Sequence, residues 1–289
     1  MIVTVVGLGI MGAPMARNLR NAGHDVIGVN RSPAPVERFV ADGGRTTTLE
    51  EAIRQSDVVL TMVPDSADAE AVLTGDAGAF AFARPDTLFI DASSIAPETA
   101  RSLSAEAISR GLRMIDAPVS GGEQGAIDAT LSIMVGGTAA DVEAAMPVLT
   151  AVGSTIVHVG PAGAGQTVKA ANQLLVAGII ELVSEALVFV DAHGVELERA
   201  VEVLAGGLAG NRILDRKAQG MLAHRFEPGF RITLHHKDLG IFSEAARQAG
   251  VVTPLGAVVT QLMASAVANG DGDLDHSALL RGVERLSGR

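Results

Sequence analysis

The 289-residue sequence contains no cysteine. This absence excludes disulfides, thiolate metal sites and cysteine nucleophiles. Basic residues are outnumbered, 22 against 33 acidic ones, and the formal net charge is -11. A surface this negative repels phosphate backbones, so we expect no nucleic-acid partner, although a few local cations can still hold a small anion in one cleft.

We also find no stretch of the sequence that resembles a targeting segment or a membrane span. The apolar stretch Met1–Gly12 has no basic region before it and runs straight into a glycine motif, so we interpret it as a first strand. The apolar stretch Leu174–Val190 carries Glu181 and Glu185, which would be costly in mid-bilayer. We therefore expect a buried helix there, no membrane association and a cytoplasmic protein.

The first 160 residues alternate short β-branched runs with amphipathic helical segments, which predicts a parallel α/β sheet with crossover helices. Strands are predicted at Ile2–Val6, Asp25–Val29, Val58–Met62, Thr87–Asp91, Met114–Ala117, Leu131–Val135 and Thr155–Val159. After Gly163 the chain has few strand signals, and one long helix is predicted from Gln166 to about Ala192. We predict a Rossmann-type dinucleotide-binding domain at residues 1–162 and an all-helical domain for substrate and oligomerisation at residues 163–289, joined by the long helix.

A glycine-rich turn follows the first strand and opens a helix. Gly7 permits a tight turn, Gly9 lets the backbone approach a pyrophosphate, and Gly12 lets helix and strand pack closely. The helix N-terminus attracts phosphates. We predict a dinucleotide site formed by the whole turn: Gly7, Leu8, Gly9, Ile10, Met11 and Gly12. The alternative is a glycine-rich turn without a ligand.

The end of the second strand indicates which dinucleotide binds. NAD-binding proteins usually place a carboxylate there to bond the ribose 2′-hydroxyl. This sequence has Asn30, Arg31 and Ser32 instead, a guanidinium with two small polar groups that suit a 2′-phosphate. We expect NADP(H) to be preferred, with NAD(H) possible. The alternative is that Arg31 is a solvated surface residue.

Lys169 is the candidate proton donor for an alcohol–carbonyl hydride transfer. No metal-ligand cluster is evident among the scattered histidines, so no metal site is predicted. Lys169 lies near the start of the long helix, and Asn172 and Gln173 follow it at i+3 and i+4, on the same face. The apolar, small surroundings suit acid–base work. The alternative is a lysine that snorkels from an interdomain helix.

Four separated motifs together resemble the β-hydroxyacid dehydrogenase family, over essentially the whole chain. They are the cofactor signature Gly7–Gly12 with Met15, Asn18, Gly23 and His24; the substrate signature Asp116–Gly122 continued through Thr130–Gly137; the catalytic-lysine signature Gly163–Gln173; and His236–Leu239. Three further stretches, Ser93–Pro97, Gly206–Gly210 and Pro228–Ile232, resemble the subgroup that reduces tartronate semialdehyde to D-glycerate, and Asp275–Leu279 also matches it.

The resemblance implies roles for matching residues. Lys169 is implied as general acid in reduction and general base in oxidation. The substrate is implied to contact Ser120, Gly121, Gly122, Asn172, Phe230 and Asp238. Further cofactor contacts are implied for Met62, Val63, Pro64, Ser94 and Lys237.

Two positions depart from the family pattern. Relatives often carry an acidic residue where this chain has Asn30, which favours the NADP(H) expectation. Many relatives have a second Asn where this chain has Gln173, so substrate choice could differ.

The expected function is reduction of a small carboxylate-bearing aldehyde, tartronate semialdehyde first, by a homodimer or homotetramer. Dehydrogenation of 3-hydroxyisobutyrate and reduction of succinic semialdehyde or glyoxylate are alternatives within the family. A non-catalytic dinucleotide-binding module and an imine-reducing enzyme are alternatives of other classes. The aligned lysine and amides of the long helix argue against the first, and imine-reducing enzymes of this fold usually lack a lysine at position 169.

Overall fold

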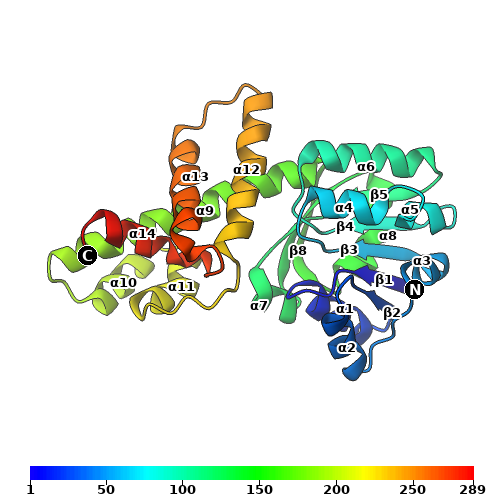
Figure 1. Ribbon diagram of the computed structural model, residues 1–289, viewed down its shortest axis with the longest axis horizontal. Coiled ribbons are helices and arrows are strands. Elements are labelled where there is room, and N and C mark those ends of the chain that lie inside the picture. Colours follow the sequence, from blue (N-terminus) through cyan, green and yellow to red (C-terminus); the bar gives the residue numbers. More distant parts are fainter. The chain divides into compact units, whose positions relative to one another are not determined.

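The computed structural model describes all residues, 1–289, and the chain divides into two compact units, Met1–Lys169 and Ala170–Arg289. The predicted α/β architecture followed by a helical half is confirmed (Figure 1). Each unit has its own apolar core.

The first unit contains one eight-stranded sheet. Its strands are β1 (Ile2–Val6), β2 (Asp25–Val29), β3 (Val58–Thr61), β4 (Leu88–Asp91), β5 (Arg113–Asp116), β6 (Val119–Ser120), β7 (Leu131–Gly136) and β8 (Gly153–Gly160). The spatial order is β2-β1-β3-β4-β5-β7-β6, with β8 paired to β7. The first five strands are parallel, β7 runs antiparallel to β5 and β6, and β8 is parallel to β7.

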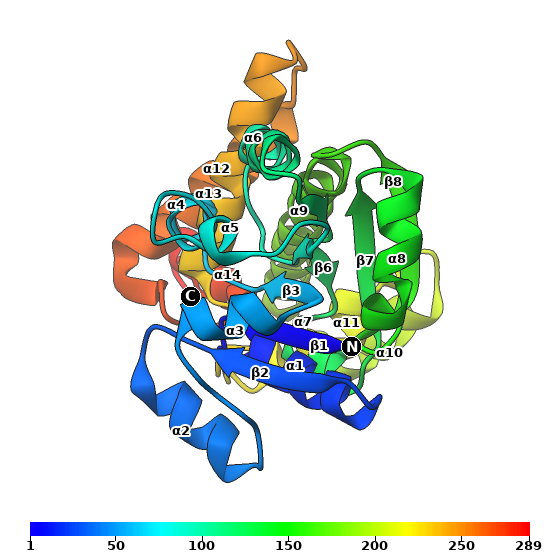
Figure 2. The same ribbon diagram turned by 90° about the vertical axis from the view of Figure 1, so that its right-hand side faces the viewer.

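Helices cover both faces of this sheet (Figure 2). They are α1 (Gly12–Asn21), α2 (Pro33–Ala41), α3 (Leu49–Gln55), α4 (Ser66–Leu73), α5 (Ala79–Phe82), α6 (Pro97–Ser109), α7 (Gly122–Ile127) and α8 (Ala139–Leu149). Neighbouring residues of a strand enter different apolar clusters: Val58 and Leu60 join one and Val59 the other. This alternation is the pattern expected when both faces of a sheet are buried.

The second unit is a helical bundle that begins within helix α9 (Ala164–Ala192). Its other helices are α10 (Leu197–Gly206), α11 (Arg212–Leu222), α12 (Ile232–Gln248), α13 (Pro254–Ala266) and α14 (Leu279–Leu286), with a π-helical turn η1 (Val267–Asp271) and a 3-10 turn η2 (His276–Ala278). The predicted long helix is confirmed and begins two residues earlier than expected, at Ala164.

Helix α9 is long and apolar enough, by length and composition, to cross a membrane. The same criteria are met by core helices of soluble proteins. In this helix Ile180, Val183 and Leu187 are buried in the core of the second unit, while Leu175, Leu182 and Phe189 are exposed.

Candidate active site

The carboxyl ends of five parallel strands form one row. The register pairs Val29 with Val6, Val6 with Thr61, Thr61 with Asp91, and Asp91 with Asp116. The loops that leave this row therefore lie along one edge of the sheet. Ligands of doubly wound α/β proteins bind at this edge.

The glycine-rich turn leaves β1 at this edge, and its backbone requires glycine at two of its three glycine positions. Gly7 has a φ of 103°, and a Cβ there would overlap the carbonyl oxygen of Met62. A Cβ at Gly12 would overlap the carbonyl oxygen of Gly7. A Cβ at Gly9 would meet nothing within 4 Å, so the turn is open where a pyrophosphate would approach. The residues present fit a dinucleotide.

Asn30 holds the turn from the end of β2. Its Oδ1 accepts a hydrogen bond from the backbone amide of Leu8 at 2.9 Å, and its Nδ2 donates to the carbonyl oxygen of Ser32 at 3.0 Å. These bonds fix the glycine turn to the second βα loop. The neighbouring Arg31 has an 85% exposed side chain and forms an ion pair of 3.1 Å with Asp68. Arg31 is therefore an exposed, ion-paired cation of this loop, and Asn30 is the residue that bonds the loop to the glycine turn.

A buried polar network follows β3 and β4. The hydroxyl group of Thr61 donates to Asp91 Oδ1 at 2.6 Å, and the backbone amide of Val63 donates to the hydroxyl of Ser93 at 2.9 Å. The second oxygen of Asp91 is buried without a hydrogen-bond partner, and burial raises the pKa of this carboxyl group. The side chain of Gln166 joins the network by donating to the Ser93 carbonyl at 2.8 Å.

Asp116, the last residue of β5, anchors the first turn of α9. Its Oδ1 accepts from the backbone amide of Gly163 at 2.7 Å and its Oδ2 from that of Gln166 at 2.9 Å. A carboxylate at a helix N-terminus satisfies amides that lack a partner within the helix. A Cβ at Gly165 would overlap the carbonyl oxygen of Met134, so glycine is needed for the helix to approach the sheet.

Lys169 lies three residues beyond Gln166 on this anchored turn and is 8% exposed. A lysine this buried is uncommon unless its ammonium group is engaged. Its backbone continues the turn that is attached to the strand-end loops at two points: Asp116 at the end of β5 accepts from the amide of Gln166, and the side chain of Gln166 donates to Ser93 after β4.

The substrate-signature loop forms the short strand β6 and the start of α7. Ser120 pairs with Ser132 of β7. Gly121 and Gly122 have φ values of 148° and 65°, a backbone that favours glycine. The loop presents a hydroxyl group and consecutive amides, which suit a carboxylate.

In the second unit, α9 and α12 carry a second group of predicted site residues. The amide of Asn172 donates to Gln173 Oε1 at 2.8 Å, and Gln173 Nε2 donates to Asp238 Oδ2 at 2.6 Å. Lys237 forms an ion pair of 2.8 Å with Asp238 Oδ1, and the side chain of Asp238 is 3% exposed. Each side chain in this hydrogen-bonded series is thus oriented by its neighbour.

Two family models match the chain. Residues 2–160 match the NAD binding domain of 6-phosphogluconate dehydrogenase, and residues 163–283 match the NAD-binding domain of NADP-dependent 3-hydroxyisobutyrate dehydrogenase. The chain is also 39% identical to 2-hydroxy-3-oxopropionate reductase of Escherichia coli (strain K12), over 98% of this chain and 97% of that protein. The chain belongs to the β-hydroxyacid dehydrogenase family.

Other relatives of this β-hydroxyacid dehydrogenase are named for other substrates. It is 35% identical to NAD-dependent L-serine dehydrogenase of Pseudomonas aeruginosa, over 99% of both chains. The solved structure of Mycobacterium tuberculosis 3-hydroxyisobutyrate dehydrogenase with L-serine has a TM-score of 0.86 and 35% identity, and covers 97% of this chain and 98% of that one. The predicted family and NAD(P)-dependent enzyme class are therefore confirmed.

The structure of this β-hydroxyacid dehydrogenase brings several predicted residues together. In the first unit Met62–Pro64 adjoin the glycine turn, and Val63 is bonded to Ser93, next to the predicted cofactor contact Ser94. In the second unit Asn172, Lys237 and Asp238 share one network. Phe230 instead packs its ring against the imidazoles of His235 and His276, each at 5.5 Å between centroids.

Sequence reasoning missed several supporting residues of the dehydrogenase. Asp116, Gln166 and Ser93 belong to the quoted motifs but have no predicted role, and Asp91 is only the last residue of a predicted strand. A polar residue among the small residues at the start of a long helix was the available signal for Gln166. The signal for Asp91 was a carboxylate at a buried strand end.

Proposed function

We propose that this dehydrogenase reduces a small carboxylate-bearing aldehyde with NADPH, and that tartronate semialdehyde, reduced to D-glycerate, is its first candidate substrate. The observation that carries the proposal is the buried Lys169 on a helix turn anchored by Asp116 and Gln166 to the strand ends that also bear the glycine turn. The 39% identical relative is named for the same reduction.

In the proposed reaction Lys169 is the proton donor. NADPH supplies the hydride to the carbonyl carbon when bound. The ammonium group of Lys169 stabilises the developing charge on the carbonyl oxygen and transfers a proton to it, so that the product is an alcohol and the amine recovers its proton from water. In the reverse direction the neutral amine removes the hydroxyl proton.

The substrate carboxylate is assigned to the β6–α7 loop. The hydroxyl group of Ser120 and the amides of Gly121 and Gly122 would donate to it, and the open space above Gly122 leaves room for a ligand. The amide of Asn172, oriented by Gln173, would orient the hydroxyl or aldehyde oxygen.

The proposed NADPH preference depends on Arg31 and Ser32. The Asn30 side chain is already bonded to Leu8 and Ser32, so the exposed guanidinium of Arg31 is the group that would move to a 2′-phosphate. A charge-assisted hydrogen bond contributes about 1.5–3 kcal/mol. Arg31→Ala should therefore reduce kcat/KM for NADPH about 10- to 100-fold and leave that for NADH nearly unchanged.

The test is steady-state kinetics of the wild type and Arg31→Ala with both cofactors. The aldehydes are tartronate, methylmalonate and succinic semialdehydes and glyoxylate. The proposal expects the highest kcat/KM for tartronate semialdehyde with NADPH. Higher efficiency with NADH in the wild type would refute the cofactor preference, and higher efficiency with another aldehyde would refute the substrate.

Oxidation of a 3-hydroxy acid is the second candidate function. The relative named for L-serine oxidation is 35% identical over 99% of the chain. The side chain of Gln173 is also longer than the second asparagine that many relatives have beside Asn172, so the amide group reaches a different position. Measuring L-serine and 3-hydroxyisobutyrate oxidation with both cofactors distinguishes this function. Oxidation more efficient than every aldehyde reduction would favour it.

A further inference from the structure

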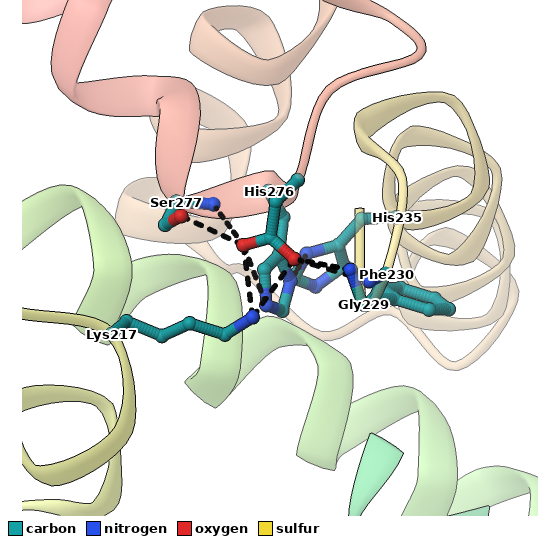
Figure 3. A network of polar contacts seen from close by, with 7 residues as sticks. Lys217, Gly229, Phe230, His235, His276 and Ser277 are labelled. Carbon is teal, nitrogen blue, oxygen red and sulfur yellow. Dashed lines mark hydrogen bonds and ion pairs between the residues drawn. The ribbon is translucent and has the colours of Figure 1, made fainter. Parts of the chain in front are cut away.

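Two buried imidazoles, those of His235 and His276, lie next to each other in the second unit (Figure 3). His235 is on α12 and is 0% exposed, and His276 begins the turn η2 and is 7% exposed. Their Nδ1 atoms are 3.0 Å apart, and His235 Nε2 lies 3.0 Å from the carbonyl oxygen of Gln173. The ring of Phe230 packs edge-on against both.

The donor and the acceptor of each hydrogen bond in this imidazole pair can be assigned. A carbonyl oxygen only accepts hydrogen bonds, so His235 Nε2 must donate to Gln173. One of the two Nδ1 atoms must donate to the other. With a neutral His235 its Nδ1 is the acceptor, so His276 Nδ1 is the donor. The hydrogen bonds then run in one direction, from His276 through His235 to Gln173.

Asp275 and Lys217 enclose the other side of the pair. Asp275 Oδ1 lies 4.0 Å from His276 Nε2, and Lys217 Nζ lies 2.8 Å from Asp275 Oδ2. Burial opposes ionisation of Asp275, but His276 and Lys217 outweigh it and hold the pKa of this carboxyl group at about 2. The carboxylate also accepts from the amides of Gly229 and Phe230 at 3.0 and 3.1 Å, and these bonds attach the turn that carries His276 to the segment before α12.

The consequence concerns Gln173, which α12 holds at two points. His235 bonds its backbone carbonyl, and Asp238 bonds its side-chain amide, which in turn fixes Asn172. Residues 235 and 238 are three apart on one helix and share a face. A loss of the His235 bond would let α12 shift and misalign the amides assigned to the substrate.

We propose that His235 and His276 are positioning residues of the dehydrogenase: their hydrogen-bonded pair fixes Gln173 on α9 and thereby orients the Asn172–Gln173–Asp238 amide chain toward the substrate. The inference rests on the proposed function. It assigns a role to the late Asp275–Leu279 motif that the proposed chemistry itself leaves unused.

The test compares His276→Leu with His276→Asn. Leucine leaves His235 Nδ1 without a donor, so the KM for the aldehyde should rise about tenfold, as expected when a buried polar group loses its partner. The KM for NADPH should change less than twofold, since the glycine turn is in the other unit. Asparagine can place an amide donor near the Nδ1 position, so it should restore the aldehyde KM to within about threefold of the wild type.

His224→Leu is the matched control. The side chain of His224 is 59% exposed and forms an ion pair with Glu284, and both residues belong to the second unit, as His276 does. This variant should keep both KM values. Equal increases of the aldehyde KM in His276→Leu and His276→Asn, or equal increases of both KM values, would overturn the inference.

Imidazole NMR separates this inference from the reaction. In ¹⁵N-histidine-labelled wild type we expect one slowly exchanging proton coupled to both Nδ1 nitrogens, lost in His276→Leu. Its absence would refute the imidazole pair even if the enzyme reduces semialdehydes. Its presence in a protein that reduces none of them would refute the proposed function and leave the pair intact.

Discussion

Glu181 lies on helix α9 with its carboxyl group buried. The residue is 5% exposed, and its Oε2 has no hydrogen-bond partner. It lines a cavity of about 230 Å³ together with residues of α13 and α14. Burial, and secondarily the charge of Glu185, raises the pKa of Glu181 from 4.5 to about 7. This carboxyl group therefore makes stability depend on pH.

The unfolding free energy of Glu181→Gln should increase relative to that of the wild type as the pH rises. The native state binds more protons than the unfolded state between pH 4.5 and about 7, so wild-type stability falls across this window and is constant above it. One pKa unit corresponds to about 1.4 kcal/mol, so the difference in unfolding free energy should grow by up to about 3 kcal/mol. Urea unfolding at pH 5 and pH 8 measures it.

The control is Glu143→Gln at an exposed position of α8. Its stability relative to the wild type should be the same at both pH values. A pH-independent effect of Glu181→Gln would show that the Glu181 carboxyl group titrates alike in the folded and unfolded chain, contrary to this account.

At the scale of a single element, the first turn of α9 depends on one carboxylate. Asp116→Asn replaces an acceptor oxygen with an amide donor that faces the amide of Gly163 or Gln166. We expect a loss of about 1–3 kcal/mol in unfolding free energy, because a buried donor loses its partner. Amide hydrogen exchange of residues 163–169 should increase.

Asp42→Asn, at an exposed helix end, is the control and should leave this exchange unchanged. Exchange of residues 163–169 that is equally slow in Asp116→Asn and in the wild type would contradict the anchoring role. Because Lys169 is on this turn, its loosening should also lower kcat in Asp116→Asn.

The strands and long helices could be predicted from the sequence because each carries a continuous pattern. β1 and β2 have the predicted bounds, and the other predicted strands differ by one or two residues at their ends. Helices α2 and α8 have no predicted bounds. Both contain proline: α2 begins with Pro-Ala-Pro, where proline suits the first turn of a helix, and α8 contains Pro147.

The candidate site was predictable where its residues are contiguous. The glycine turn and the lysine turn are each one stretch of sequence. The contacts of Asp116 with Gly163 and of His276 with His235 join residues 47 and 41 positions apart. No local spacing indicates such pairs, because the fold alone brings them together.

At the scale of the whole molecule, α9 has an uncovered apolar face. Leu175, Leu182 and Phe189 recur every seven residues and have exposed fractions of 63%, 64% and 64%. A repeat of seven keeps side chains on one face of a helix, as in paired helices. We propose that this face pairs with a second copy of the chain in a homodimer or homotetramer.

Light scattering should give the mass of a dimer or tetramer for the wild type. Leu182→Glu should shift it to a smaller species, because a charge at a packed apolar contact is costly. Leu208→Glu, at a fully exposed position before α11, should not. A monomeric wild type, or the same mass for Leu182→Glu, would contradict the proposed interface.

The most direct test of the proposed chemistry is the single-turnover rate of hydride transfer in Lys169→Ala, measured with saturating NADPH and tartronate semialdehyde, with and without methylammonium. Loss of a general acid lowers turnover by about 10²–10⁴-fold. We expect a loss in this range with NADPH affinity unchanged, and partial recovery as methylammonium supplies the missing proton donor. A variant that transfers hydride at the wild-type rate would contradict the role of Lys169.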